Sequence, residues 1–298
     1  MSELNAIKDF LEDSQVTDLL IDGQISMSVE RQGKLEIVAN PFSNEIEVTN
    51  WVRNLLRTYG SRLDIAKPIS EISLHSDYGL LRIHAVLGGE CSKSTQISIR
   101  RHLSSSLTLQ DLVDKATISK QDLETLSQII KSKENFVIIG GTGSGKTTLL
   151  RAMLGEVSQE RVITIEDAPE LSLGGRSVEL TTRPGNHEGI GEISLGQLVR
   201  EALRMRPDRL VVGEARGEEL LVLLQAMNTG HNGSGFTLHA NSIEDTWPRM
   251  LAILVGTGAT AEFSHLLAKC SLSWVIQVQR LNGIRAVTAI ERFVTPIV

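Results

Sequence analysis

The stretch Gly140-Gly141-Thr142-Gly143-Ser144-Gly145-Lys146-Thr147 decides the fold of this chain. It fits the phosphate-binding pattern G-x-x-x-x-G-K-[ST], follows an apolar run at residues 135 to 139 and precedes a helical pattern at residues 147 to 154. Glycines let successive backbone N–H groups curl around a phosphate chain, and the following helix directs its positive dipole end at the same place. The stretch therefore predicts a nucleotide-binding α/β domain.

The residue types in this loop indicate how a nucleotide would be held. The lysine places a positive charge against the β and γ phosphate oxygens, and the threonine after it offers a hydroxyl to Mg²⁺. We therefore expect ATP and Mg²⁺ as the ligands. The predicted nucleotide-binding residues are Gly140, Gly141, Thr142, Gly143, Ser144, Gly145, Lys146, Thr147 and Thr148.

Composition and charge narrow the class of protein. The 298 residues are 41% hydrophobic and 22% charged, which indicates about two packed domains. A net charge of −6 argues against broad attraction to nucleic acid. The first residues are not basic, and no apolar run approaches the ~20 residues of a membrane span. We expect a cytoplasmic protein whose two cysteines, Cys91 and Cys270, are buried reduced thiols.

The chain is expected to divide near residues 103 to 115. The polar run at residues 104 to 106 indicates a linker, and Thr108 with Asp111 indicates the start of a helix. The predicted domains are residues 1–104, a small α+β domain, and residues 105–298, in which strands and helices alternate. For the first domain we expect strands at 16 to 21, 71 to 74, 81 to 87 and 96 to 101, and a helix at 45 to 59.

Two carboxylates at predicted strand ends are candidates for the chemistry. Glu214 follows the apolar run at residues 209 to 212, where a general base can reach a water aligned on the γ-phosphate. Glu166 ends the run at residues 162 to 165, and it is the predicted Mg²⁺ ligand together with Thr147. Asp167 and Glu170 follow directly, and for these two surface charge at a strand end remains the alternative.

The order of four motifs resembles the type II/type IV secretion ATPase superfamily. Within it, residues 179 to 192 are most similar to the CpaF/TadA branch, which powers Flp (Tad) pilus assembly and has the VirB11-like conjugation ATPases as near relatives. The motifs correspond to the Walker A, Asp-box, Walker B and His-box elements of the superfamily, at residues 140 to 147, 165 to 170, 203 to 216 and 229 to 242.

The resemblance implies further site residues. His239 matches the family histidine that senses the γ-phosphate, and His231 begins the same motif; buried, satisfied histidines are the alternative. Arg82 and Arg100 match arginines of the first domain that close the site and neutralise the migrating phosphoryl group. Ordinary surface arginines are the alternative here, and action within or between subunits stays open.

The resemblance also implies an architecture and a function. The fold class is α/β, a RecA-like P-loop ATPase core preceded by a small α+β N-terminal domain. We expect a homohexameric ATP-hydrolysing motor that powers Flp/Tad pilus assembly or protein secretion, peripheral to the cytoplasmic membrane face. Its expected partners are inner-membrane platform proteins, and nucleic acid is not expected. The alternatives are a conjugation or DNA-transport ATPase and an ATP-gated scaffold that does not hydrolyse.

Pro248 is expected to start or kink a helix.

Overall fold

The chain forms two compact units, residues 1–105 and 106–298. A computed structural model describes residues 2–31, 33–102, 107–183, 185, 191–281 and 283–295. The predicted boundary after residue 104 falls in the stretch 103–106, outside the described residues. Each unit has its own hydrophobic core and is described by itself.

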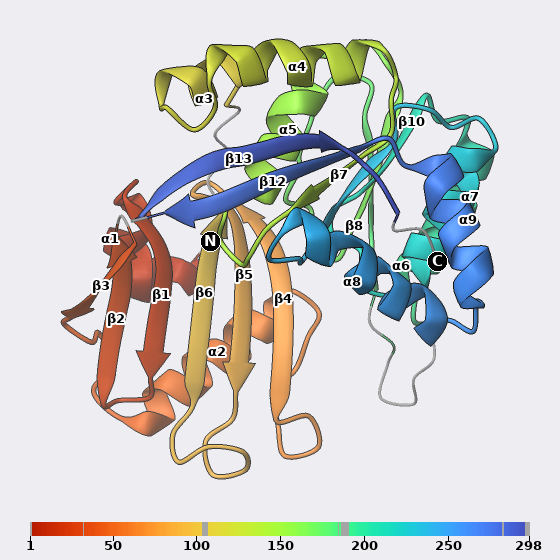
Figure 1. Cartoon of the computed structure of the whole chain (residues 1–298). Helices are drawn as coiled ribbons and strands as arrows, with labels where there is room; N and C mark the ends of the chain where they lie inside the picture. Colours follow the sequence, from red (N-terminus) through yellow and green to blue (C-terminus); the bar gives the residue numbers. More distant parts are fainter. Residues whose placement is uncertain are drawn as a thin grey trace. The chain divides into compact units, whose positions relative to one another are not determined.

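In its described part the first unit is an antiparallel sheet with helices on one face (Figure 1). The strand order is β3-β2-β1-β6-β5-β4. Every second residue of β4 is buried, so one face of the sheet packs on α2 and the other stays accessible. The elements are η1 (Ser2–Ile7), α1 (Lys8–Glu12), β1 (Val16–Asp22), β2 (Ser26–Arg31), β3 (Lys34–Val38), α2 (Glu45–Thr58), β4 (Ile69–Ser76), β5 (Gly79–Val86) and β6 (Gln96–His102).

The second unit is a seven-stranded sheet in its described part, with helices on both faces (Figure 1). The order is β13-β12-β7-β11-β10-β8-β9, and every neighbouring pair is parallel except β12 with β13. The strands are β7 (Phe136–Ile139), β8 (Val162–Glu166), β9 (Val178–Thr181), β10 (Arg209–Val212), β11 (Gly235–Leu238), β12 (Trp274–Leu281) and β13 (Ile284–Arg292). The helices are α3 (Leu109–Asp114), α4 (Lys120–Lys131), α5 (Lys146–Gly155), α6 (Leu195–Ala202), η2 (Leu203–Met205), α7 (Glu218–Asn228), α8 (Ile243–Gly256) and α9 (Ala261–Ser271).

Burial on both faces explains why the central strands are mostly apolar. Along β7, Ile138 packs with the layer of α3, α4 and α5, whereas Ile139 packs with the layer of α6 to α9. Successive side chains of a strand point to opposite faces, so both faces favour apolar residues. The carboxyl ends of the parallel strands remain as the place for polar residues, and the predicted α/β fold class is confirmed.

Of the local predictions from sequence, one helix start is confirmed, whereas another helix start and the burial of the cysteines are not. Thr108 and Asp111 form a reciprocal capping box at the start of α3, as expected. Pro248 was expected to start or kink its helix; it does not start it, because α8 begins at Ile243 with Ser242 as its cap and Pro248 lies inside the helix. The expected burial of the cysteines is also wrong, because Cys91 and Cys270 are free and exposed.

Candidate active site

The phosphate-binding loop connects the end of β7 to the start of α5. A side chain on Gly140, at φ +150°, would overlap the carbonyl oxygen of Val278 in the neighbouring strand β12. Gly143 and Gly145 have φ of +71° and +105°, in the region that only glycine adopts without strain. Three of the predicted glycines are therefore required by the backbone itself.

The loop has the properties of an anion cradle. Helix α5 begins at Gly145 without a side-chain cap, so its first N–H groups lack an intrahelical partner. The hydroxyl of Ser144 is buried and makes no hydrogen bond to any described residue. Exposed N–H groups at the positive end of a helix, beside an unpaired hydroxyl, fit a phosphate chain.

Lys146 lies over the loop and uses all three of its N–H donors. Its Nζ lies 2.9 Å from the carbonyl oxygens of both Gly140 and Gly141, and 3.4 Å from Nδ1 of His239. Burial lowers the pKa of the ammonium group, and the charges of Glu214 and Glu170 oppose that shift. The lysine therefore joins the phosphate loop to the predicted base and histidine.

His239 joins Lys146 to Glu214. Its Nε2 lies 3.2 Å from Oε1 of Glu214, and both side chains are a little over one-third exposed. Burial, the nearby ammonium of Lys146 and the charges of Arg216 and Arg249 lower the pKa of the imidazole. A neutral ring with its proton on Nε2 fits this arrangement, because Nδ1 then accepts from Lys146 and Nε2 donates to the carboxylate.

Glu166 has a different environment at the end of β8. Its carboxylate accepts hydrogen bonds from the backbone N–H groups of Glu170 and Leu171, and its side chain packs against Gly213. Burial raises the pKa of Glu166 to about 8, so the side chain is protonated at neutral pH. The structure thus separates the two predicted carboxylates into a buried neutral acid, Glu166, and a half-exposed carboxylate, Glu214.

The residues proposed for Mg²⁺ fit a weakly coordinated ion better than a dedicated metal cage. Thr147 is the second residue of α5 and is half-buried. Within the described part of the chain, no three His, Cys, Asp or Glu side chains converge as metal ligands. Magnesium bound with a nucleotide takes most of its ligands from phosphates and water, which agrees with this sparse set. The assignment of Glu166 as a ligand stays a prediction.

The two predicted arginines of the first unit stand side by side. Arg82 on β5 is directly opposite Arg100 on β6, so both side chains emerge from the same face of the sheet. Arg82 forms an ion pair with Glu71, and Nε of Arg100 donates to Asp18 at 2.8 Å. Each arginine is thus held by a carboxylate, while its guanidinium stays substantially exposed.

The remaining motif residues have mixed surroundings. His231 is half-buried with Nδ1 3.2 Å from the carbonyl of Ala226, at the end of α7. Within the described residues, no hydrogen bond joins it to Lys146 or Glu214. In the stretch 179 to 192, residues 184 and 186–190 lie outside the described residues. The features that favoured the CpaF/TadA branch are therefore not tested by the structure.

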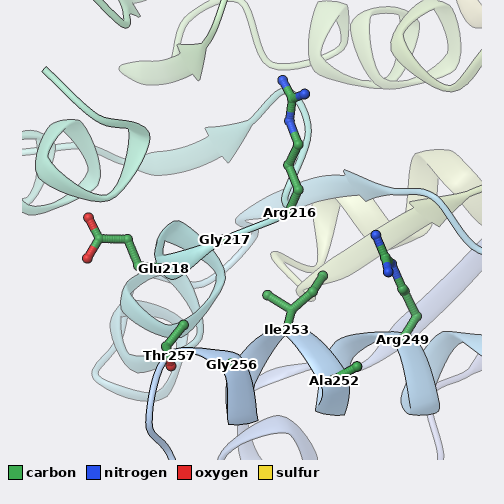
Figure 2. Close-up of a pocket in the computed structure, with 8 residues that line it drawn as sticks. All are labelled: Arg216, Gly217, Glu218, Arg249, Ala252, Ile253, Gly256 and Thr257. Atoms are coloured by element: carbon green, nitrogen blue, oxygen red, sulfur yellow. The ribbon is translucent and has the colours of Figure 1, made fainter. Parts of the chain in front are cut away.

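A pocket of about 500 Å³ lies beside the loop that follows β10, not on the phosphate loop itself (Figure 2). Figure 2 shows its floor on α8, with Arg216 and Glu218 projecting from the start of α7 and the segment before it. Arg216 also forms an ion pair with Asp167. This pairing ties the end of β8 to the segment after Glu214, so the two acidic motifs are physically connected.

Comparisons with known proteins agree with this geometry. The sequence profile of the type II/IV secretion system protein family matches residues 85–286. The chain belongs to this family. A Mycobacterium tuberculosis protein named for conjugal transfer is 38% identical over 270 residues, covering 88% of this chain and 76% of that protein. The conjugal transfer protein TrbB of Rhizobium radiobacter is 31% identical over 240 residues, covering 78% of this chain and 70% of its own.

Solved structures of similar fold include the pilus retraction motor PilT with bound ADP. It is 20% identical, with a TM-score of 0.72, covering 99% of this chain and 83% of that one. At this identity the likeness concerns the fold, which is that of the family's ATPases.

No helix in the described residues is long and apolar enough to span a bilayer.

The sequence left the role of Glu170 open and gave no sign of Arg285. The charge of Glu170 opposes the lowered pKa of Lys146, which places Glu170 close to the phosphate loop. Arg285 on β13 donates from Nε to the carbonyl oxygen of Gly143 at 3.1 Å. Only the pairing of β12 with β7 brings that arginine to the loop, so no local pattern could have signalled it.

Proposed function

We propose that this protein hydrolyses ATP to ADP and phosphate and thereby drives a type II/IV secretion machine. The observation that carries the proposal is the continuous connection from Lys146 through His239 to Glu214. It places a phosphate-binding cation and a carboxylate base on opposite sides of one imidazole ring. A protein that only binds ATP has no need of a base coupled to the phosphate loop in this way.

The chemistry follows from this connection. When phosphates enter the loop, Lys146 exchanges the carbonyl oxygens of Gly140 and Gly141 for the β and γ phosphate oxygens. Glu214 orients a water and accepts its proton as the water oxygen attacks the γ-phosphorus and the bond to the β-phosphate oxygen breaks. Bound Mg²⁺ would neutralise the phosphate charge, with Thr147 and, once it gives up its proton, Glu166 as its proposed protein ligands. His239, neutral and bonded to the base, detects the γ-phosphate through Lys146.

Arg82 and Arg100 are proposed to complete the site from the first unit. To reach a phosphate they exchange Glu71 and Asp18 for it, which their exposed positions permit. Whether they act on their own chain or a neighbouring one is decided by mixing Arg100→Ala and Lys146→Ala chains. If the arginine acts between subunits, the mixture regains activity that neither variant has; if within one chain, no ratio restores it.

For the cellular role, we propose a homohexamer at the cytoplasmic face of the membrane, powering Flp/Tad-type pilus assembly or protein secretion through inner-membrane platform proteins. The similarity of residues 179 to 192 to the CpaF/TadA branch and the acidic net charge support this role. Conjugal transfer is the second candidate, and the names of the similar proteins favour it.

The deciding experiment measures ATP hydrolysis at ~0.15 M salt, where nonspecific DNA binding is weakened. The protein is assayed alone, with DNA, and with a cytoplasmic fragment of a platform protein. Glu214→Gln serves as the control for contaminating activity. Stimulation by the platform fragment supports the pilus or secretion role, and stimulation by DNA alone supports conjugal transfer. Wild-type turnover no faster than that of Lys146→Ala, which lacks the phosphate-binding cation, would contradict the ATPase proposal itself.

A further inference from the structure

The hairpin of β12 and β13 extends beyond the strand that carries the phosphate loop. Strand β12 pairs with β7 as far as Gln277, opposite Ile139, and then continues to Leu281. Strand β13 returns antiparallel from Ile284. Because β7 ends where the loop begins, the free end of the hairpin lies alongside the loop. The carbonyl oxygen of Val278 is so close to the loop that a Cβ on Gly140 would overlap it.

Arg285, on this free end, is fixed against the loop. Its Nε donates to the carbonyl oxygen of Gly143, and its Cδ lies 3.3 Å from where a Cβ of Gly145 would stand. The guanidinium has five N–H donors, and only the Nε contact is made with the described residues. The side chain is therefore anchored at one atom, with its terminal nitrogens available at the start of α5.

The charges around Arg285 lack a counterion. Arg280 is directly opposite it across the hairpin, and like charges in this position repel. Arg285 also lies beside Gly145 at the positive end of α5, where a cation is unfavourable. Neither arginine forms an ion pair with a described residue. An anion in the loop, next to the unpaired hydroxyl of Ser144, would relieve this repulsion.

We propose that Arg285 binds the phosphate chain of the nucleotide directly, from the C-terminal hairpin of the same chain. The planar guanidinium suits two phosphate oxygens at once, which a single ammonium such as Lys146 does not. Arg280 adds charge to the same face of the hairpin. The inference rests on the proposed function for the identity of the ligand, but it concerns binding and does not depend on hydrolysis.

The test measures the Kd of Mg-ATP and Mg-ADP for the full chain and three variants. Arg285→Gln removes the charge, Arg285→Lys keeps it, and Arg57→Gln removes an equal charge from an exposed position of α2 in the first unit. We expect Arg285→Gln to bind ATP about 10-fold more weakly, Arg285→Lys about 3-fold, and Arg57→Gln unchanged. The salt dependence of binding should also be shallower for Arg285→Gln. Thermal unfolding checks that each variant is folded.

Each result of this test either supports or contradicts the role of Arg285. Equal Kd values for wild type and Arg285→Gln would overturn the inference, and so would a salt dependence of binding that this substitution leaves unchanged. If Arg285→Gln fails to fold, the Lys variant and the Arg280→Gln variant decide, because loss of charge at Arg280 should also weaken binding. Wild-type protein that binds ATP but does not hydrolyse it contradicts the proposed ATPase activity and leaves this inference standing.

Discussion

Charged side chains at the two ends of strand β10 have opposite environments. At its start, Arg209 is fully buried: it donates to both carboxylate oxygens of Glu160 and to the carbonyls of Gly233 and Ile130. After its other end, Glu214 is one-third exposed and bonded to a single ring nitrogen of His239. A charge with every partner supplied by the protein fixes the fold, whereas a charge with few, replaceable partners can exchange them for a substrate.

The largest effect is expected at the buried end. Arg209→Leu should lower the free energy of unfolding by about 3 kcal/mol, because Glu160 and two carbonyl groups lose their partner inside the protein. Denaturant unfolding measures this. The control, Arg204→Leu, removes an exposed arginine and should change stability by less than about 0.5 kcal/mol. Equal effects of the two substitutions would show that the buried pairing does not anchor this end of the sheet.

At the exposed end, binding and chemistry should separate. Glu214→Gln should bind ATP within about 3-fold of wild type but hydrolyse it at least ~100-fold more slowly, about 2.7 kcal/mol in the barrier. Lys146→Ala should instead lose ATP binding, because its ammonium contacts the phosphates. Equilibrium binding and steady-state turnover are measured on both variants. Rapid hydrolysis by purified Glu214→Gln would show that Glu214 is not the catalytic base.

Glu166 differs from both of these residues, because burial keeps its carboxyl group neutral. Its pKa of about 8 exceeds the ordinary value of 4.5, so between these values the folded chain holds a proton that the unfolded chain has lost. Stability should therefore fall as pH rises through that window. Glu166→Gln removes the penalty and should raise stability by about 4 kcal/mol at pH 8 and by less than about 0.5 kcal/mol at pH 4.5.

Urea unfolding of this variant at the two pH values measures the difference. Glu124→Gln, at an exposed position of α4, is the control and should show no such pH dependence. The same gain for Glu166→Gln at both pH values would contradict the raised pKa.

The smallest effect is expected for the connecting histidine. His239→Asn should lower the turnover rate about 10-fold and leave ATP affinity within about 2-fold, since the ring touches Lys146 and Glu214 but not the phosphates. Because burial and neighbouring cations lower its pKa, the ring is neutral at pH 7. The wild-type rate should thus show no change from titration of His239 between pH 7 and 8. A pH–rate profile of both proteins tests this.

Much of the site was readable from the sequence because its motifs are local. The expected strand at 136 to 139 coincides with β7, and Glu214 and His239 do follow the ends of neighbouring parallel strands. The hairpin of β12 and β13 was not foreseen, nor was the start of α8 before Pro248. In that helix, capping by Ser242 and the burial of Trp247 and Met250 outweigh the missing N–H of the proline.

The sequence by itself determined the phosphate loop, the alternation of strands and helices, and the family, because backbone geometry and burial impose these patterns on neighbouring residues. The tertiary structure alone decided that Glu166 is a buried neutral acid, that Glu214 lies partly exposed beside His239, and that Arg285 reaches Gly143. Both outcomes depend on desolvation and on contacts between strands far apart in the chain, which no local run of residues encodes.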